Sequence, residues 1–329
     1  MFTRRQAILG LGAGVLMSGL AAQAQSDGRM RRIGVMMQIP ESDPEAQARL
    51  AALQRGLQEL GWAPGRDFRI DYRGGTDPGK IRTGAADLIA LNPDVILAVP
   101  NSIITELRRQ TRSIPLVFVN VADPVEAGLV TSLAKPGGNA TGFISNAATT
   151  IRGKWLELLK EMSPELRHVL VLFNPNSPNP TIKKVIAESA RTLGLLMSSF
   201  DVNTAGDVER AIGGHARNRN PGLIATPGGP VTVHRKLIIA SAARHHMPAM
   251  YPYRYYAAEG GLMSYGADVL HMWTQAASYV DRVLKGEKPG NLPVQAPTKY
   301  ELVINLQTAK NLGIRVPQAL LLRADEVIS

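Results

Sequence analysis

The chain has 329 residues, 45% of them hydrophobic, and a formal net charge of +10 at pH 7. It contains no cysteine, so we expect no disulfide, no thiolate nucleophile, no cysteine-based metal site and no lipid anchor on an N-terminal cysteine. The basic residues are scattered, without a dense stripe and interleaved aromatics, so no nucleic-acid partner is expected. A chain of this length exceeds what one small core usually holds, which predicts two domains.

The N-terminus has the pattern of an export signal. Arg4-Arg5 precedes an apolar run over residues 7–20, and Ala22-Gln-Ala24 is a small-x-small cleavage pattern. We therefore predict a signal peptide at residues 1–24 and a periplasmic location. The arginine pair resembles a twin-arginine signal, but Ala7 stands where that signal usually has a bulky apolar residue, so the ordinary secretory route stays open.

Strands and helices alternate in the first part of the chain. Ser42-Asp-Pro-Glu45 has the pattern of a capping box with proline in the first turn, and Asp77-Pro78 opens a second helix. A third helix is expected over about 102–110. Apolar or alternating runs predict strands over 31–37, 68–72, 92–98 and 115–119. This alternation is typical of a parallel sheet that is covered by helices on both faces.

The same alternation restarts in the second part of the chain. Asn220-Pro-Gly-Leu-Ile echoes Asn92-Pro-Asp-Val-Ile at the same place in the pattern. The expected elements are a helix around 155–159, a strand over 168–173, a helix over about 180–193 and strands over 195–200 and 220–225. The sequence therefore predicts an α/β protein with two Rossmann-like lobes.

The C-terminal part is too small for a third domain. It contains a helix over 269–284, a proline-containing loop over 285–298, a strand over 301–305 and a short helix over 307–312. Each should return to one of the two lobes, and several crossings would form a hinge. We assign residues 30–145 and 265–298 to the first lobe and residues 146–264 and 299–329 to the second.

A tyrosine-rich stretch, residues 251–266, holds five of the eight tyrosines. Tyrosine combines an apolar face with a hydroxyl group, which suits a pocket for a small molecule, and Arg254 adds a cation that could clamp a carboxylate. Gly266 and its neighbouring glycines allow sharp turns. We interpret the stretch as the rim of a ligand site joined to an interlobe crossover. Alternatively, Arg254 pairs with Glu259 and the tyrosines pack within their own domain.

Ligands bind beyond the carboxyl ends of the strands in an open α/β sheet. Helix N-termini at Ser42, Ser102 and Asp123 would direct N–H groups toward an anionic group, although Asp123 also fits a simple helix cap and Asn174 a simple turn. This rule and the tyrosine stretch together select the following candidate ligand-binding residues: Ser42, Asn101, Ser102, Asn120, Asp123, Asn174, Thr226, Gly228, Tyr251, Arg254 and Tyr265.

Motifs for catalysis are missing from the sequence. It contains no His-x-x-x-His metal pattern, no Gly-x-Ser-x-Gly elbow and no Walker loop. The adjacent His245 and His246 would point to different faces of a helix. We therefore expect no enzyme activity, no metal and no cofactor, although a catalytic pair that is assembled only in three dimensions stays an alternative.

Several stretches resemble periplasmic solute-binding proteins of ABC importers, and in particular the subgroup that includes tryptophan- and phenylalanine-binding receptors. The stretches are residues 122–130, 135–142, 259–265, 279–289 and 301–310. The resemblance implies a type I binding-protein fold, with two lobes, three crossovers and a ligand in the cleft. It also implies that loops at Asn101-Ser102, Asp123, Asn146 and Thr226–Gly229 face the ligand.

One departure from this subgroup concerns the ligand. Relatives often carry an aspartate in the loop that matches Thr226–Pro230, where this chain has Gly228 and Gly229, so the ammonium group of an amino acid would lose a partner. The resemblance implies a monomeric receptor that captures a small solute, either an amino acid or an aromatic or related small carboxylate. Its partner would be the permease of an ABC importer. The alternatives are a sensory binding protein for a membrane receptor and an exported enzyme.

Overall fold

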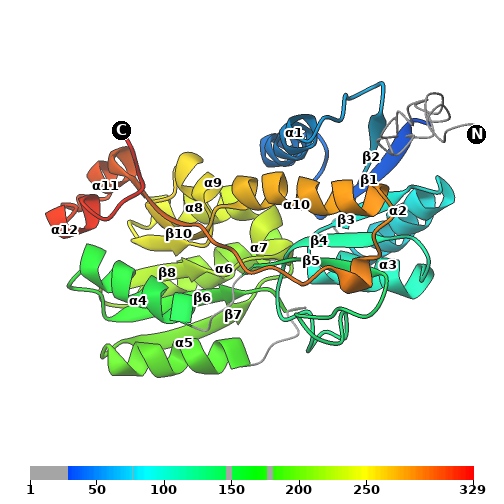
Figure 1. The fold of residues 1–329 in the computed structure, drawn as a ribbon. Coiled ribbons are helices and arrows are strands. Elements are labelled where there is room, and N and C mark those ends of the chain that lie inside the picture. The colour runs from blue at the N-terminus through cyan, green and yellow to red at the C-terminus, as the bar shows by residue number, and fades with distance from the viewer. Residues whose placement is uncertain (1–28, 76, 146–149, 176–180) are drawn as a thin grey trace, which may run out of the picture.

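The computed structural model describes residues 29–75, 77–145, 150–175 and 181–329. The predicted signal peptide and Asn146 lie outside these residues. The described chain forms two α/β lobes, each built on its own sheet, which stand side by side in Figure 1. The predicted fold class, with two sheets in two lobes, is therefore confirmed.

The first lobe contains a five-stranded parallel sheet of order β2-β1-β3-β4-β5. Its strands are β1 (Arg31–Met37), β2 (Phe68–Gly74), β3 (Val95–Ala98), β4 (Leu116–Val121) and β5 (Ala140–Ile144). The sequence analysis does not predict β5, which is short and contains a glycine. Glycine is required there, because a Cβ on Gly142 would lie 1.9 Å from the carbonyl oxygen of Phe118.

Helices cover both faces of this sheet. They are α1 (Pro44–Glu59), α2 (Pro78–Ala90), α3 (Asn101–Gln110) and α10 (Val269–Leu284). Alternate residues of β1 face opposite layers: Val35 and Met37 pack with α1 and α10, and Met36 packs with α2 and α3. Helix α10 comes from the C-terminal part of the chain and packs on the first lobe, and the short 3-10 helix η1 (Pro289–Asn291) follows it.

The second lobe contains a seven-stranded sheet of order β12-β11-β10-β9-β8-β6-β7. Its strands are β6 (His168–Phe173), β7 (Leu196–Asp201), β8 (Pro221–Ala225), β9 (Ala249–Tyr251), β10 (Met263–Ala267), β11 (Tyr300–Asn305) and β12 (Glu326–Ile328). All neighbours are parallel except β10 and β11. This pair is antiparallel because β10 leaves the second lobe at Ala267, and the chain returns beside it through Tyr300.

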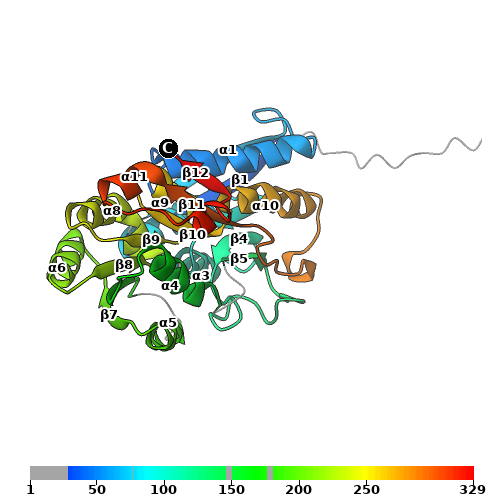
Figure 2. The same cartoon turned by 90° about the vertical axis from the view of Figure 1, so that its left-hand side faces the viewer.

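Helices also cover both faces of the second sheet. They are α4 (Thr150–Met162), α5 (Thr181–Thr192), α6 (Ala205–His215), α7 (Gly229–Val233), α8 (Arg235–Arg244), α9 (Arg254–Ala258), α11 (Leu306–Asn311) and α12 (Gln318–Leu321). Helices α4 and α5 pack on one face, and α6 and α8 pack on the other, as Figure 2 shows in end view. The two lobes therefore have the same layered plan.

The echo between the two asparagine-proline pairs has a structural basis. Asn92 and Asn220 both adopt φ of 48°, and each is followed by a proline and then by a buried strand. Asparagine tolerates this left-handed conformation better than most residues. The same turn therefore leads from a helix into the sheet in both lobes.

Three chain crossings connect the lobes. They follow β5, lie between β10 and α10, and lie between η1 and β11. Two of them are tied together, because the backbone N–H of Asp268 donates to the carbonyl of Lys299 (3.1 Å) and the Lys299 ammonium donates to the Asp268 carboxylate (2.8 Å). The boundary that the sequence analysis places at residue 265 falls within β10, all of whose residues pair in the second sheet.

Glu301 sits at this hinge, opposite the end of β10. Burial raises the pKa of Glu301 to about 7, the charge of Asp268 adds to this rise, and Lys299 and Arg254 oppose it. A carboxyl group whose pKa is higher in the folded protein holds its proton more tightly when folded. Its contribution to the free energy of unfolding therefore decreases as the pH rises from about 4.5 through 7.

We expect Glu301→Gln to flatten this pH dependence. Thermal unfolding between pH 5 and pH 8.5 should show the variant gaining stability relative to the unchanged protein as the pH rises through 7. Glu287→Gln, which removes the same charge from an ion pair with Arg282, is the control. If the plots of melting temperature against pH for the unchanged protein and for Glu301→Gln run parallel, the carboxyl group of Glu301 does not titrate in this range.

Candidate ligand-binding cleft

A cavity of about 680 Å³ lies between the lobes. It is lined from the carboxyl ends of the strands in both sheets, as the strand-end rule predicts. Five predicted residues come together there, namely Asn101, Ser102, Asn120, Asn174 and Gly228. Pro227, Tyr253 and Tyr255 also line the cavity and belong to segments that the sequence analysis assigns to the site. The sequence analysis did not select the following lining residues: Arg49, Ser145, Asn203, Pro230 and Thr232.

The first-lobe wall is organised around the start of α3. The Asn101 side-chain amide donates to the carbonyl of Ala122 (2.6 Å), and its oxygen accepts from the Ala122 N–H (3.0 Å), so this side chain holds the loop after β4 in place. The Gln38 amide donates to the Ser102 hydroxyl oxygen (3.0 Å). The N–H groups that begin α3 have no partner within the helix and contribute partial positive charge to the cavity.

Asn120 and Tyr253 connect the two walls. Asn120, at the end of β4, has φ of 59°, and its side-chain amide donates to the Tyr253 hydroxyl at 2.9 Å. Tyr253 follows β9 in the second lobe and is 4% exposed. The hydrogen bond between them therefore spans the cleft.

We expect Tyr253→Phe to weaken ligand binding about fivefold, because a neutral hydrogen bond contributes about 1 kcal/mol and the Asn120 amide would lose its partner across the cleft. Titration calorimetry with a ligand that the unchanged protein binds measures this loss of affinity. Tyr256→Phe removes a hydroxyl from the same aromatic cluster without touching Asn120, and it should leave the affinity unchanged. Equal losses in the two variants would show that the bridge has no special role.

Two glycines shape the loop after β8. Gly228 and Gly229 have φ of 95° and 53°, in the left-handed region that favours glycine. A Cβ on Gly229 would lie 2.6 Å from the Asn174 amide nitrogen. The side chain of Asn174 therefore fills the space beside this loop, and it supplies a polar group on this wall of the cavity, together with Asn203 and Thr232.

A layer of buried charge lies behind Tyr255. The Arg49 guanidinium donates to Glu45 (2.7 Å) and lies 5.7 Å from the centre of the Tyr255 ring, and Arg235 lies 5.6 Å from the same ring. Arg235 donates to Asp43 (2.9 Å) of the first lobe. The i, i+4 spacing of Glu45 and Arg49 is visible in the sequence, but the partners of Arg235 are not.

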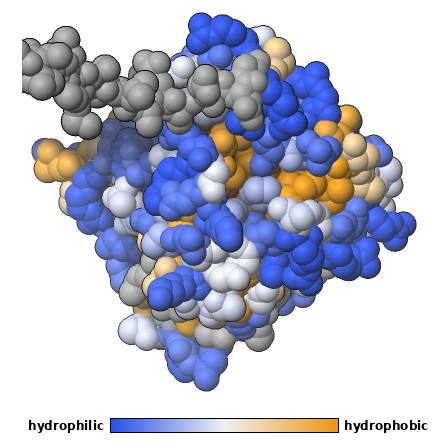
Figure 3. Space-filling model, turned by 45° about the vertical axis from the view of Figure 1, so that its right-hand side comes forward, coloured by the Kyte–Doolittle hydropathy of each residue, from blue (hydrophilic) through white to orange (hydrophobic). Residues whose placement is uncertain are grey.

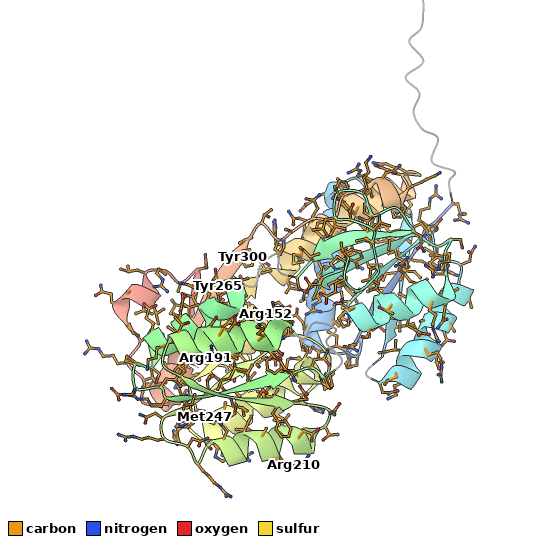
Figure 4. The ribbon with its side chains drawn as sticks, turned by 90° about the horizontal axis from the view of Figure 1, so that it is seen from below. Arg152, Arg191, Arg210, Met247, Tyr265 and Tyr300 are labelled. Atoms are coloured by element: carbon orange, nitrogen blue, oxygen red, sulfur yellow. The ribbon has the colours of Figure 1, made fainter. Side chains whose placement is uncertain are left out.

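Three tyrosines of the tyrosine-rich stretch, Tyr251, Tyr256 and Tyr265, lie away from the cavity. Tyr251 is 1% exposed and stacks on Tyr256, with ring centroids 5.1 Å apart, because it belongs to the core-facing side of β9. Burial raises its pKa. Tyr265 stacks on Tyr300 at 6.4 Å, and Figure 4 shows this pair beside the hinge. Thr226, a predicted site residue outside this stretch, is also away from the cavity. It is buried, and its hydroxyl donates to the backbone carbonyl of Leu172.

The two sequence interpretations of Arg254 are both wrong about its partner. Arg254 begins α9 and forms a two-pronged ion pair with Glu326 of β12, with both N–O distances 2.6 Å. It does not line the cavity. Glu259, the predicted alternative partner, is bound instead by Arg235.

Two predicted helix N-termini also need correction. Asp43, not Ser42, caps α1, and Ser42 is exposed outside the cavity. A single turn follows Asp123 in place of a helix, and Asp123 itself has a φ of 41°. Asp123 faces Arg152 of α4: burial lowers the pKa of Arg152, and the Asp123 charge opposes this. Figure 4 shows Arg152 on α4, so this charge interaction also links the lobes.

Among the described residues, no three His, Asp or Glu side chains gather in a way that could hold a metal ion. None of the helices in the described part of the chain has the length and apolar character needed to cross a membrane.

This two-lobed fold with an interlobe cavity belongs to a known class. The model of the ABC transporter substrate binding protein family matches residues 32–328, and the chain belongs to that family. The predicted relationship to ABC substrate-binding proteins of type I is therefore confirmed.

Particular relatives are similar over most of their length. A tyrosine-binding protein of Clostridioides difficile (strain R20291) is 25% identical over 264 residues, which cover 79% of this chain and 75% of the relative. A conserved domain protein from Vibrio cholerae is 28% identical, with a TM-score of 0.83 over 91% of this chain and 100% of the other. An ABC domain from Streptococcus pneumonia in complex with L-Trp has 24% identity and a TM-score of 0.81 over the same shares.

Proposed function

We propose that the protein is an exported receptor that captures a small aromatic solute in the interlobe cleft and delivers it to an ABC importer. The observation that carries this proposal is a cavity lined from both sheets and crossed by the Asn120–Tyr253 hydrogen bond. Tyr253, Tyr255 and two prolines offer apolar faces, while amide and hydroxyl groups offer hydrogen bonds. Family membership and the ligands named for two relatives support it.

Further parts of this proposal rest on the sequence and the surface. The signal pattern at residues 1–24 supports export to the periplasm, where the permease of the importer would be the partner. We propose a monomer that is not an enzyme and carries no cofactor. On the face shown in Figure 3, hydrophilic residues predominate and hydrophobic ones occur in small groups, which suits a receptor that stays monomeric.

Mass spectrometry of the small molecules that co-purify with the protein tests the proposal. We expect a stoichiometric aromatic solute that rebinds in calorimetry and is released unchanged. Small-angle scattering should show a smaller radius of gyration with the ligand than without it, because the lobes close about the hinge. Chemical conversion of the bound molecule would favour an enzyme. Failure to find any binding solute would overturn the receptor proposal.

A further inference from the structure

The chemical class of the ligand can be narrowed from the carboxylates around the cleft, on the basis of the proposed function. Two carboxylates line the described part of the cavity, Asp77 and Glu106. Asp77 caps α2, accepts from the Lys80 N–H and has a half-exposed side chain. Glu106 accepts from Arg109 (2.9 Å) and from Gln110 (2.6 Å). Both carboxylates are therefore engaged by the helices that carry them.

The carboxylates behind the cavity wall are held by arginines. Glu45 accepts from Arg49, and Asp43 accepts from Arg235. The charge of Asp123 acts on the buried Arg152. An ammonium group in the cleft would have to compete with a guanidinium for each of these three carboxylates.

The three internal segments outside the described residues contain no acidic residue. Residue 76 is threonine, residues 146–149 are Asn-Ala-Ala-Thr, and residues 176–180 are Asn-Ser-Pro-Asn-Pro. The composition of these segments therefore does not change the count of carboxylates. An ammonium group that lost its water in such a site without gaining a carboxylate partner would bind unfavourably.

The cavity offers several donors to a hydrogen-bond acceptor. The first N–H groups of α3, the Ser102 hydroxyl and the Ser145 hydroxyl can donate, and the helix dipole adds partial positive charge. The Arg49 guanidinium also lines the cavity. The apolar faces come from Tyr253, Tyr255 and neighbouring prolines.

We propose that the cleft binds aromatic carboxylates that lack an α-ammonium group, in preference to the corresponding amino acids. The carboxylate faces the start of α3, and the ring lies against the tyrosines of the second lobe. Asn174 provides a neutral amide on the opposite wall, and none of the described second-lobe residues that line the cavity is a carboxylate.

Calorimetry with matched pairs of compounds tests this preference. L-tyrosine is compared with 3-(4-hydroxyphenyl)propionate, and L-tryptophan with indole-3-propionate, so that each pair differs only in the ammonium group. We expect the compound without the ammonium group to bind at least about tenfold more tightly in one or both pairs. Equal or tighter binding of both amino acids would overturn the inference and leave the proposed receptor function standing.

Asn174→Asp provides a nearly isosteric gain of charge. In this variant the preference within each pair should shift toward the amino acid by at least about tenfold, because the new carboxylate can pair with the ammonium group. Asn311→Asp adds the same charge on the exposed end of α11, away from the cleft, and should leave the preference unchanged. Melting temperatures of both variants show whether they are folded.

Other results of these titrations would contradict the proposed ligand preference. A similar shift in both variants, or no shift in a folded Asn174→Asp protein, would contradict the assignment of the ammonium-binding side to this wall. If none of the four compounds binds, the inference is wrong. The co-purification experiment then decides separately whether the protein is a receptor for another solute.

Discussion

Replacing Gly266 with alanine should destabilise the protein by more than about 3 kcal/mol. Gly266 lies in β10, and a Cβ there would lie 1.9 Å from the carbonyl oxygen of Pro252 and 3.6 Å from the ring of Tyr253. The obstacle is backbone, so a side-chain rotation cannot relieve it. The strand would have to move away from the loop that carries Tyr253 into the cleft, and binding should weaken as well.

Gly214→Ala is the matched control for this change. Gly214 lies in α6 and has no atom within 4 Å of the position of a Cβ, and alanine in a helix is favoured over glycine by about 0.5–1 kcal/mol. Denaturant unfolding followed by tryptophan fluorescence compares the two variants. A Gly266→Ala protein as stable as the control would mean that β10 can shift without loss, and that the close packing at the hinge has no structural role.

Gly266 also shows which structural roles of a residue can be predicted from the sequence and which cannot. Gly266 was interpreted as a residue that allows a sharp turn, because glycine often has that role. Its actual role is to let one strand approach another segment closely, which depends on a carbonyl group fourteen residues earlier in the chain. Local patterns report local backbone preferences, but they do not report which distant backbone comes near.

Helices and buried strands were predictable because their signals are local. The helix over 269–284 is predicted with the bounds that α10 has, and its buried residues recur at helical spacing. Two elements at the sheet edges were missed: β5 is interrupted by Gly142, and β12 contains too few residues for a periodic pattern. The prediction of two lobes survived because it depended on the order of many elements and not on any one of them.

The candidate site was predictable in the loops that follow strands and unpredictable among the charges. Asn101, Ser102 and Asn120 follow directly from the strand-end rule. Arg254 and Arg235 look alike in the sequence, since each is a lone arginine near the start of a short helix. One pairs at the surface and the other is buried between the lobes, because tertiary packing selects their partners.

Replacing Arg235 with alanine should therefore weaken ligand binding strongly, and this is the second large effect that we expect. The Arg235 side chain is 3% exposed and donates to Glu259 at 2.8 Å and to Asp43 of the first lobe at 2.9 Å. Burial lowers the pKa of Arg235, but Glu259 and Asp43 raise it further, so the guanidinium stays charged. Closing the lobes without it would bury the Asp43 carboxylate without its cationic partner, at a cost of about 2–5 kcal/mol in binding free energy.

Arg254→Ala is the control, because it removes the same type of side chain from a two-pronged pair at the surface. Its partner Glu326 is 36% exposed, and such a pair contributes about 0–1 kcal/mol. Asp43→Asn is a second arm: asparagine keeps the cap of α1 while it removes the charge that meets Arg235 across the cleft. Calorimetry and scattering should show weaker binding and a larger fraction of open molecules for Arg235→Ala and Asp43→Asn, with little change for Arg254→Ala. If all three variants bind equally well, the ion pair between the lobes does not contribute to closure.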